Sequence, residues 1–129
     1  MAEQRRDQRD GRGAQESAGI VGEARRRSVR AEEAHAWGAL VATARRTVSD
    51  GLVVGTSGNV SVRVGDTVLV TPSGVPYDRL APADTVGVDL DGRQVLGTLL
   101  PTSELPMHLA VYRSTDAHAV VQVGAECAP

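Results

Sequence analysis

One stretch of the sequence, GLVVGTSGNVSVRVGDTVLVTPSG over residues 51–74, constrains the fold more than any other. Valines alternate with polar residues along 60–64, and a second β-branched run covers 68–70, which predicts two half-buried strands. Gly65-Asp66 between these runs is typical of a two-residue hairpin turn. Two short loops rich in glycine and hydroxyl side chains, 56–59 and 71–74, bracket the predicted hairpin. The question is whether these loops serve only as turns.

A helix is predicted before the hairpin, from about Ala31 to Asp50. Glutamates stand near its start and arginines near its end, as the helix dipole favours. Gly51 follows and can adopt the left-handed conformation that ends helices. The apolar positions of one helical stripe are Trp37, Leu40, Val41, Ala44 and Val48.

The remainder of the sequence predicts further strands and a second helix. A third strand is expected over 86–90, with a short return strand over 94–96. Thr102 or Ser103 can cap a helix whose apolar stripe continues to residue 112. Residues 118–123, HAVVQV, read as a buried strand. With 129 residues the chain allows one domain, and this order of elements predicts an α+β fold in which helices cover a mixed or antiparallel sheet.

Residues 1–30 differ from the rest in composition, being rich in arginine, acidic residues, glutamine and glycine. Such a segment buries too little apolar surface to offset its ordering entropy, so we expect a disordered leader over 1–30 and a folded domain over 31–129. A basic arm that binds RNA or an acidic surface is the alternative. Interleaved acidic residues and the lack of aromatic side chains for base stacking argue against that alternative.

The overall composition argues against some classes of binding partner and indicates a cellular compartment. The net charge of -2 offers no general attraction for nucleic acid, and no apolar run approaches the ~20 residues of a membrane span. The single cysteine, Cys127, cannot form an internal disulfide, which suits a reducing compartment. Arg25–Arg27 are not followed by the apolar segment of an export signal. We therefore expect a cytoplasmic protein that binds neither nucleic acid nor membranes.

Two groups of residues could carry chemistry. Glycines and hydroxyls in the loops 56–59 and 71–74 could let the backbone approach a phosphate, although the same residues are ordinary in turns. Thr102-Ser103 adds hydroxyls at a predicted helix N-terminus, where the dipole favours an anion. Glu104 and His108 would share one face of that helix as a metal pair or an acid/base pair. Two ligands do not make a metal site, so a partly buried structural histidine is the favoured interpretation.

Four blocks of the sequence resemble the N-terminal part of the class II aldolase/adducin family. They are GTSGNVSVR (55–63), VLVTPSGVPYDRL (68–80), PTSELPMHLAVY (101–112) and AHAVVQ (117–122). The blocks follow the family's order and spacing, and the resemblance covers roughly residues 32–122. It implies a three-layer α/β/α domain around a largely antiparallel sheet, of the kind usually assembled as a tetramer, with the C-terminal part of the domain missing from this chain.

The resemblance also implies a function and a site. Family enzymes cleave or epimerise sugar phosphates with the help of zinc, which acts as a Lewis acid on the substrate oxygens. Glu104 matches the family's catalytic acid/base. The positions that match the family's phosphate-binding loops are Gly58, Asn59, Ser73, Gly74, Thr102 and Ser103.

The sequence departs from the family where zinc would bind. Two zinc-binding histidines of the family, in an H-x-H motif, are replaced by Gln122 and Gly124, and a third would lie beyond Pro129. We therefore expect no metal site, and His118 reads as a polar strand residue rather than a replacement ligand. The abrupt loss of resemblance after Gln122 suggests a frameshifted or truncated reading frame.

These departures leave several interpretations of the chain. The favoured one is a truncated class II aldolase relative with a sugar-phosphate cradle and weak or absent aldol cleavage. The alternatives are a non-enzymatic, adducin-like interaction module, or a gene fragment that makes no stable protein. An interaction module could form a homo-oligomer or assemble with a full-length family member.

Overall fold

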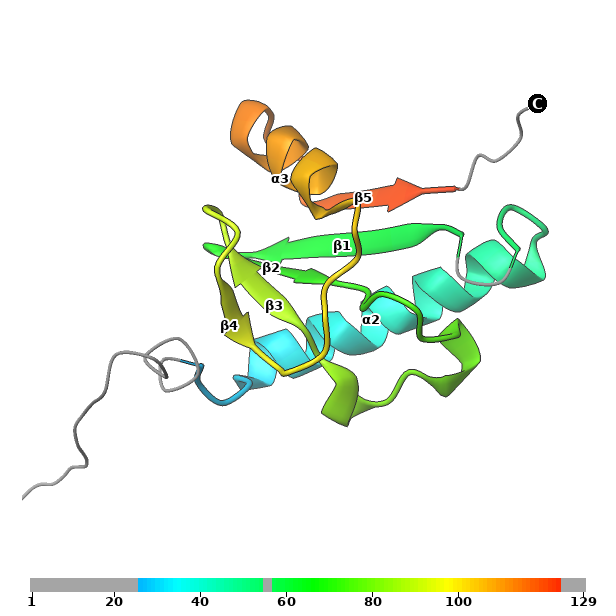
Figure 1. Cartoon of the computed structure of the whole chain (residues 1–129), viewed down its shortest axis with the longest axis horizontal. Helices are drawn as coiled ribbons and strands as arrows, with labels where there is room; N and C mark the ends of the chain where they lie inside the picture. Colours follow the sequence, from blue (N-terminus) through cyan, green and yellow to red (C-terminus); the bar gives the residue numbers. More distant parts are fainter. Residues whose placement is uncertain (1–25, 55–56, 124–129) are drawn as a thin grey trace, which may run out of the picture.

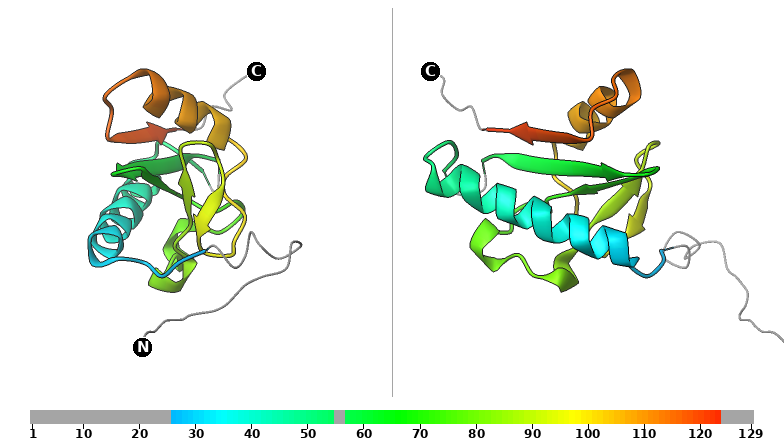
Figure 2. Two further views of the ribbon diagram at one scale, coloured as in Figure 1. Left: turned by 90° about the vertical axis from the view of Figure 1, so that its left-hand side faces the viewer. Right: turned by 180° about the vertical axis from the view of Figure 1, so that it is seen from behind.

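The computed structural model describes residues 26–54 and 57–123, which form one five-stranded antiparallel sheet with a helix on each face (Figures 1 and 2). The strand order across the sheet is β4-β3-β2-β1-β5. The predicted α+β fold, with helices on both faces of an antiparallel sheet, is confirmed. The elements are α2 (Ala31–Ser49), β1 (Asn59–Val64), β2 (Thr67–Val70), η1 (Tyr77–Arg79), η2 (Pro82–Asp84), β3 (Gly87–Asp89), β4 (Gln94–Leu96), α3 (Leu105–Ser114) and β5 (Ala119–Gln122).

The predicted hairpin forms the centre of the sheet. β1 and β2 pair in antiparallel register, with Val62 opposite Leu69 and Val64 opposite Thr67. Gly65 makes the turn at φ +60°, a conformation that favours glycine. Because side chains alternate along a strand, Val60 and Val62 of β1 face α2, whereas Ser61 between them faces α3.

Each face of the sheet carries its own hydrophobic core. The α3 face is covered by the smaller cluster of Val68, Val88, Leu109 and Tyr112. The larger cluster lies under α2 and includes the only tryptophan, whose indole N–H donates to the Ala81 carbonyl at 3.1 Å. Its buried members are Trp37, Leu40, Val41, Ala44, Val53, Val60, Leu69, Tyr77, Leu80 and Leu96.

A buried ion pair holds the start of α2. The two residues at 26 and 27, which precede the helix, are bonded to the rest of the domain. Both guanidinium nitrogens of Arg27 donate to the Glu33 carboxylate, at 2.6 and 2.8 Å, and Glu33 also accepts the Arg30 backbone N–H at 2.9 Å. Arg26 donates to the Gly97 carbonyl at 3.1 Å. The remainder of the expected leader, residues 1–25, lies outside the described residues.

Two local predictions were wrong. The strand at 118–123 is not buried: β5 is the outermost strand of the sheet, so Val121 and Val123 remain 46% and 40% exposed. The N-cap position of the second helix is Glu104, whose side chain makes no cap hydrogen bond, rather than Thr102 or Ser103. The Thr102 backbone N–H donates to the Thr71 carbonyl at 3.1 Å, which joins this segment to the end of β2. The helix therefore begins only at Leu105. Within the described residues, neither helix is long and apolar enough to cross a lipid bilayer.

Candidate functional site

A polar cavity of about 300 Å³ gathers the residues that the sequence singled out. It lies where the start of β1, the end of β2 and the start of α3 meet. The two hydroxyl-rich loops and the segment before α3, far apart in the sequence, form its walls. Every residue predicted to bind phosphate lines it, as does Glu104; the full lining is Ser57, Gly58, Asn59, Thr71, Pro72, Ser73, Gly74, Tyr77, Thr102, Ser103 and Glu104.

Hydrogen bonds between the three segments hold the cavity in shape. Thr71 joins β2 to β1, because its hydroxyl accepts the Val60 backbone N–H at 3.3 Å and its own N–H donates to the Val60 carbonyl at 3.0 Å. The Thr71 carbonyl accepts from the Thr102 N–H, which attaches the segment before α3. The buried Tyr77 hydroxyl donates to the Gly58 carbonyl at 2.5 Å. The cavity walls are therefore cross-linked to one another rather than being independent loops.

Two of the predicted glycines are required by local geometry. A Cβ atom at Gly58 would lie 2.5 Å from a Val53 methyl carbon and 2.8 Å from the Gln122 carbonyl oxygen. Gly74 has φ +77°, which an L side chain rarely adopts. Turn geometry and close packing thus explain these glycines without any ligand, and the case for a binding site depends on the other lining groups.

The electrostatic character of the cavity comes from neutral donors. Glu104 is the only charged residue among those that line it. Thr71, Ser73, Thr102 and Ser103 add hydroxyl groups to the lining, and the segment that leads into α3 forms part of the wall. Hydroxyls, backbone N–H groups and a helix N-terminus are able to hold an anion without a cationic side chain. The arrangement suits a phosphoryl group placed beside one carboxylate.

His108 does not pair with Glu104. It is fully buried between α3 and β1, where its Nδ1 lies 2.6 Å from the Ser61 hydroxyl and its Nε2 bonds to the Asn59 side-chain oxygen. Burial lowers the pKa of His108 to about 4, so the ring is neutral at neutral pH. His108 is thus buried in the α3 core rather than paired with Glu104, and Glu104 is the only charged residue that lines the cavity.

Three polar residues that support the site were not singled out from the sequence. Tyr77 holds Gly58, and Ser61 and Tyr112 continue the hydrogen bonds of His108 into the core, with 2.8 Å between their hydroxyls. A signal for Ser61 was available, because a serine on the inward face of a valine-rich strand must find a partner. The tyrosines carried no comparable signal.

Gln122, at the first of the zinc positions that the resemblance implies, lies beside the cavity rather than in its lining. Gln122 pairs across the sheet with Asn59, and its side-chain oxygen is buried without a hydrogen-bond partner in the described structure. His118 is exposed beside Arg63, at the opposite end of the β1–β5 pairing from Gln122. Over residues 26–54 and 57–123, no three His, Cys, Asp or Glu side chains come together as metal ligands. Thr56, Gly124 and Cys127 lie outside the described residues.

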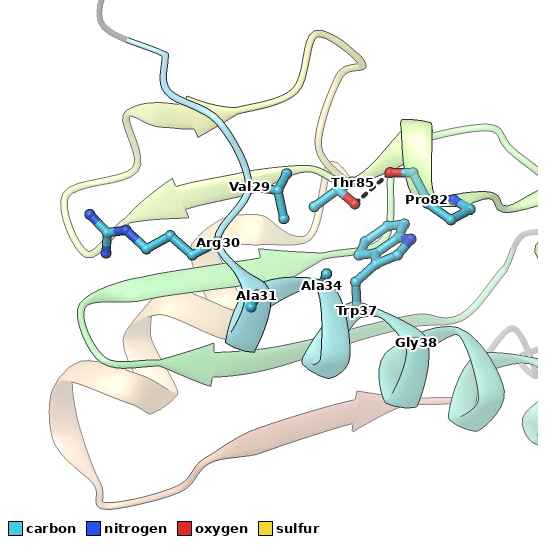
Figure 3. Close-up of a pocket in the computed structure, with 8 residues that line it drawn as sticks. All are labelled: Val29, Arg30, Ala31, Ala34, Trp37, Gly38, Pro82 and Thr85. Carbon is cyan, nitrogen blue, oxygen red and sulfur yellow. Dashed lines mark hydrogen bonds between the residues drawn. The ribbon is translucent and has the colours of Figure 1, made fainter.

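A second cavity of about 280 Å³ lies against the N-terminal half of α2 and is mostly apolar (Figure 3). The Trp37 indole forms one wall, and Pro82 and Thr85 of the neighbouring loop form another. None of the predicted site residues lines it. It therefore plays no part in the candidate site.

The comparisons with known proteins identify the family. The profile of the Class II Aldolase and Adducin N-terminal domain matches residues 38–126. The chain belongs to this family. The match spans all of the predicted site residues.

The relatives of this class II aldolase family member include sugar-phosphate aldolases. L-fuculose phosphate aldolase of Escherichia coli K12 is 49% identical over 72 residues, which cover 55% of this chain and 33% of that protein. The 5-deoxy-D-ribulose 1-phosphate aldolase of Bacillus thuringiensis serovar kurstaki is 41% identical over 85 residues, covering 64% of this chain and 40% of that protein. A solved L-fuculose 1-phosphate aldolase superimposes with a TM-score of 0.62 at 33% identity, over 65% of this chain and 41% of that one. The matches thus span a third to two fifths of these relatives.

Proposed function

We propose that this class II aldolase family member binds a sugar phosphate in the polar cavity, with the phosphoryl group held by the loops at 57–59 and 71–74 and by the start of α3. The observation that carries the proposal is the convergence of three separate segments on one cavity lined by hydroxyls, an asparagine and one carboxylate. The names of the relatives, aldolases of fuculose phosphate and of a deoxyribulose 1-phosphate, supply the substrate class.

The proposed roles follow from the chemistry of the lining. Asn59, Ser73, Thr102 and Ser103 would donate hydrogen bonds to phosphate oxygens, while the glycine-containing loops allow close approach of the backbone. Glu104 would be the acid/base group, because it is the only carboxylate among the residues that line the cavity. Its place at the N-cap of α3, next to Ser103, sets it beside the proposed phosphate position.

We further infer that aldol cleavage by this chain is weak or absent. The residues at the zinc positions do not fit the metal, because the Gln122 amide is a poor zinc ligand and Gly124 has no side chain. The Gln122 side-chain oxygen is buried and accepts no hydrogen bond in the described part of the chain, which supports the inference that this position holds no metal-binding network. We therefore derive no catalytic step through zinc.

The experiment separates binding from turnover. Calorimetric titration of the purified chain with inorganic phosphate and with fuculose 1-phosphate should show binding that Asn59→Ala and Ser73→Ala weaken. Ser49→Ala, on an exposed turn of α2, is the matched control and should bind as the wild type does. No binding of either ligand by the wild-type chain would refute the proposed cradle.

The second measurement tests the expected lack of activity. Aldol cleavage of fuculose 1-phosphate and related ketose phosphates should stay at background with and without added zinc. Zinc-dependent cleavage that disappears in Glu104→Ala would show that the chain is an active enzyme and would overturn the second inference.

An interaction module is the second candidate, and one observation favours it. β5 is an edge strand whose outer hydrogen-bonding side is unpaired within the described residues, and Val121 and Val123 are exposed there. Such an edge can pair with the same strand of a second copy of this chain. Light scattering after size exclusion should then give a dimer that Val121→Lys converts to a monomer, whereas a monomeric wild type would rule out this second candidate.

A further inference from the structure

A continuous chain of buried hydrogen bonds leads from the α3 core to the wall of the polar cavity. The Tyr112 hydroxyl lies 2.8 Å from the Ser61 hydroxyl, which lies 2.6 Å from Nδ1 of His108. Nε2 of His108 bonds to the side-chain oxygen of Asn59, which lines the cavity. All four side chains are buried, with exposed fractions from 0% at Ser61 and His108 to 4% at Asn59. We call these four residues the relay.

The direction of the hydrogen bonds is set at the cavity end of the relay. The Asn59 side-chain oxygen can only accept, so Nε2 of His108 carries the hydrogen and donates to it. A neutral imidazole carries one proton, so Nδ1 is unprotonated and accepts from the Ser61 hydroxyl. Ser61 in turn accepts from the Tyr112 hydroxyl.

This direction determines which end of the Asn59 amide is available to a ligand. Because the oxygen is held by His108, the NH2 group is the part of the amide left for the cavity. An NH2 group donates to a phosphate oxygen, whereas an amide oxygen in the same place would repel it. A side chain of the same size at position 108 that lacked the Nε2 donor would allow both orientations of the Asn59 amide.

We propose that His108 is a positioning residue that fixes the Asn59 amide as a hydrogen-bond donor for an anionic group in the polar cavity. The inference rests on the proposed function for the identity of the ligand, a phosphoryl group. The inference can still be tested apart from the proposed function, since it concerns the tautomer of His108 and the orientation of the Asn59 amide. His108 touches no ligand itself and acts only through Asn59.

A purely structural role for His108 makes a different prediction. If the ring only filled space in the α3 core, an apolar side chain of similar volume would leave phosphate affinity unchanged. If it orients Asn59, affinity follows the presence of a donor at the Nε2 position. His108→Gln keeps an N–H donor near that position, and His108→Met fills the volume without one.

The test uses the full chain with inorganic phosphate as the probe. The dissociation constant should rise about tenfold in His108→Met and stay within about threefold of wild type in His108→Gln. Ser61→Ala, which removes the donor to Nδ1, should weaken binding by an intermediate factor. Equal affinities of wild type and folded His108→Met would overturn the inference, whereas absence of binding in the wild type would refute the proposed function instead.

A spectroscopic measurement on the wild type keeps the inference testable if the variants do not fold. Nitrogen-15 NMR at neutral pH should show His108 with a protonated Nε2 and an unprotonated Nδ1. Phosphate should shift the side-chain NH2 signals of Asn59. A ring protonated at Nδ1 would overturn the relay, whether or not the chain binds phosphate.

Discussion

The buried His108 predicts that the fold loses stability in mild acid. Its ring is fully buried and neutral, and burial lowers its pKa to about 4. In the unfolded chain a histidine titrates near its ordinary value of about 6.5. Between these two values the unfolded state binds more protons than the folded state, so the free energy of unfolding falls as the pH falls. The loss begins near the unfolded value and is complete near the folded one.

The size of the effect follows from the two pKa values. A lowering from 6.5 to about 4 corresponds to about 3 kcal/mol, because each unit is worth about 1.4 kcal/mol. Because His108 has 0% exposure, solvent does not screen the effect of burial, and the full free-energy difference applies. A domain of this size is stable by about 5–15 kcal/mol, so the loss is a large fraction of the total.

Urea unfolding measured at intervals from pH 7 to pH 4 provides the assay, with the fluorescence of the buried Trp37 as the signal. His108→Gln is the control, because glutamine fits a similar volume and does not titrate. The variant is less stable than wild type at pH 7, and the gap between the two should shrink by about 3 kcal/mol as the pH approaches 4. Parallel pH profiles for the two proteins would refute the argument that His108 is held neutral.

Three further predictions concern other parts of the fold. Glu33→Gln should destabilise the chain by about 2 kcal/mol in urea unfolding, because the Arg27 guanidinium and the Arg30 N–H both lose a charged acceptor. Gly97→Ala should cost at least about 3 kcal/mol in the same assay, since its Cβ would lie 2.0 Å from the Thr85 carbonyl oxygen; Gly51→Ala, with φ +76° but open space, should cost only about 1 kcal/mol. Tyr77→Phe should cost about 1–2 kcal/mol and weaken phosphate binding, because the buried Gly58 carbonyl loses its donor; unchanged affinity would show that the loop at 57–59 does not need this tie.

The parts of the fold that were predictable from the sequence are those governed by local periodicity. The α2 stripe and the valine alternation of the β1–β2 hairpin determined which faces are buried, and the structure follows both. The prediction was wrong at the C-terminal end of the stripe, where Val48 is 43% exposed and Thr47 is buried in its place. Burial of the Thr47 side chain is compatible with its polarity, because its hydroxyl donates to the Ala44 carbonyl at 2.6 Å.

Features that depend on the position of an element in the sheet were not predictable from local sequence. The apolar run at 118–123 looks the same whether the strand is central or at an edge, and only the strand order shows that β5 is outermost. The start of α3 was misplaced for a similar reason, because the Thr102–Thr71 bond joins segments distant in sequence. The convergence of the cavity residues was expected only through the family resemblance, since turn chemistry alone explained each loop.

The proposed binding cradle and the family's zinc positions rest on different elements of the fold. The cradle is built from the ends of β1 and β2 and the start of α3, and its supports are Tyr77, Thr71 and His108. Gln122, at the first of the zinc positions that the resemblance implies, is the last residue of β5, and its side-chain oxygen takes no part in the relay or in the cavity lining. Only the backbone of Gln122 matters to the cradle, through its close approach to Gly58, and a substitution leaves that backbone in place. Replacing the zinc ligands would therefore remove metal-assisted turnover while leaving phosphate affinity intact, which is why the two properties have to be measured separately in this chain.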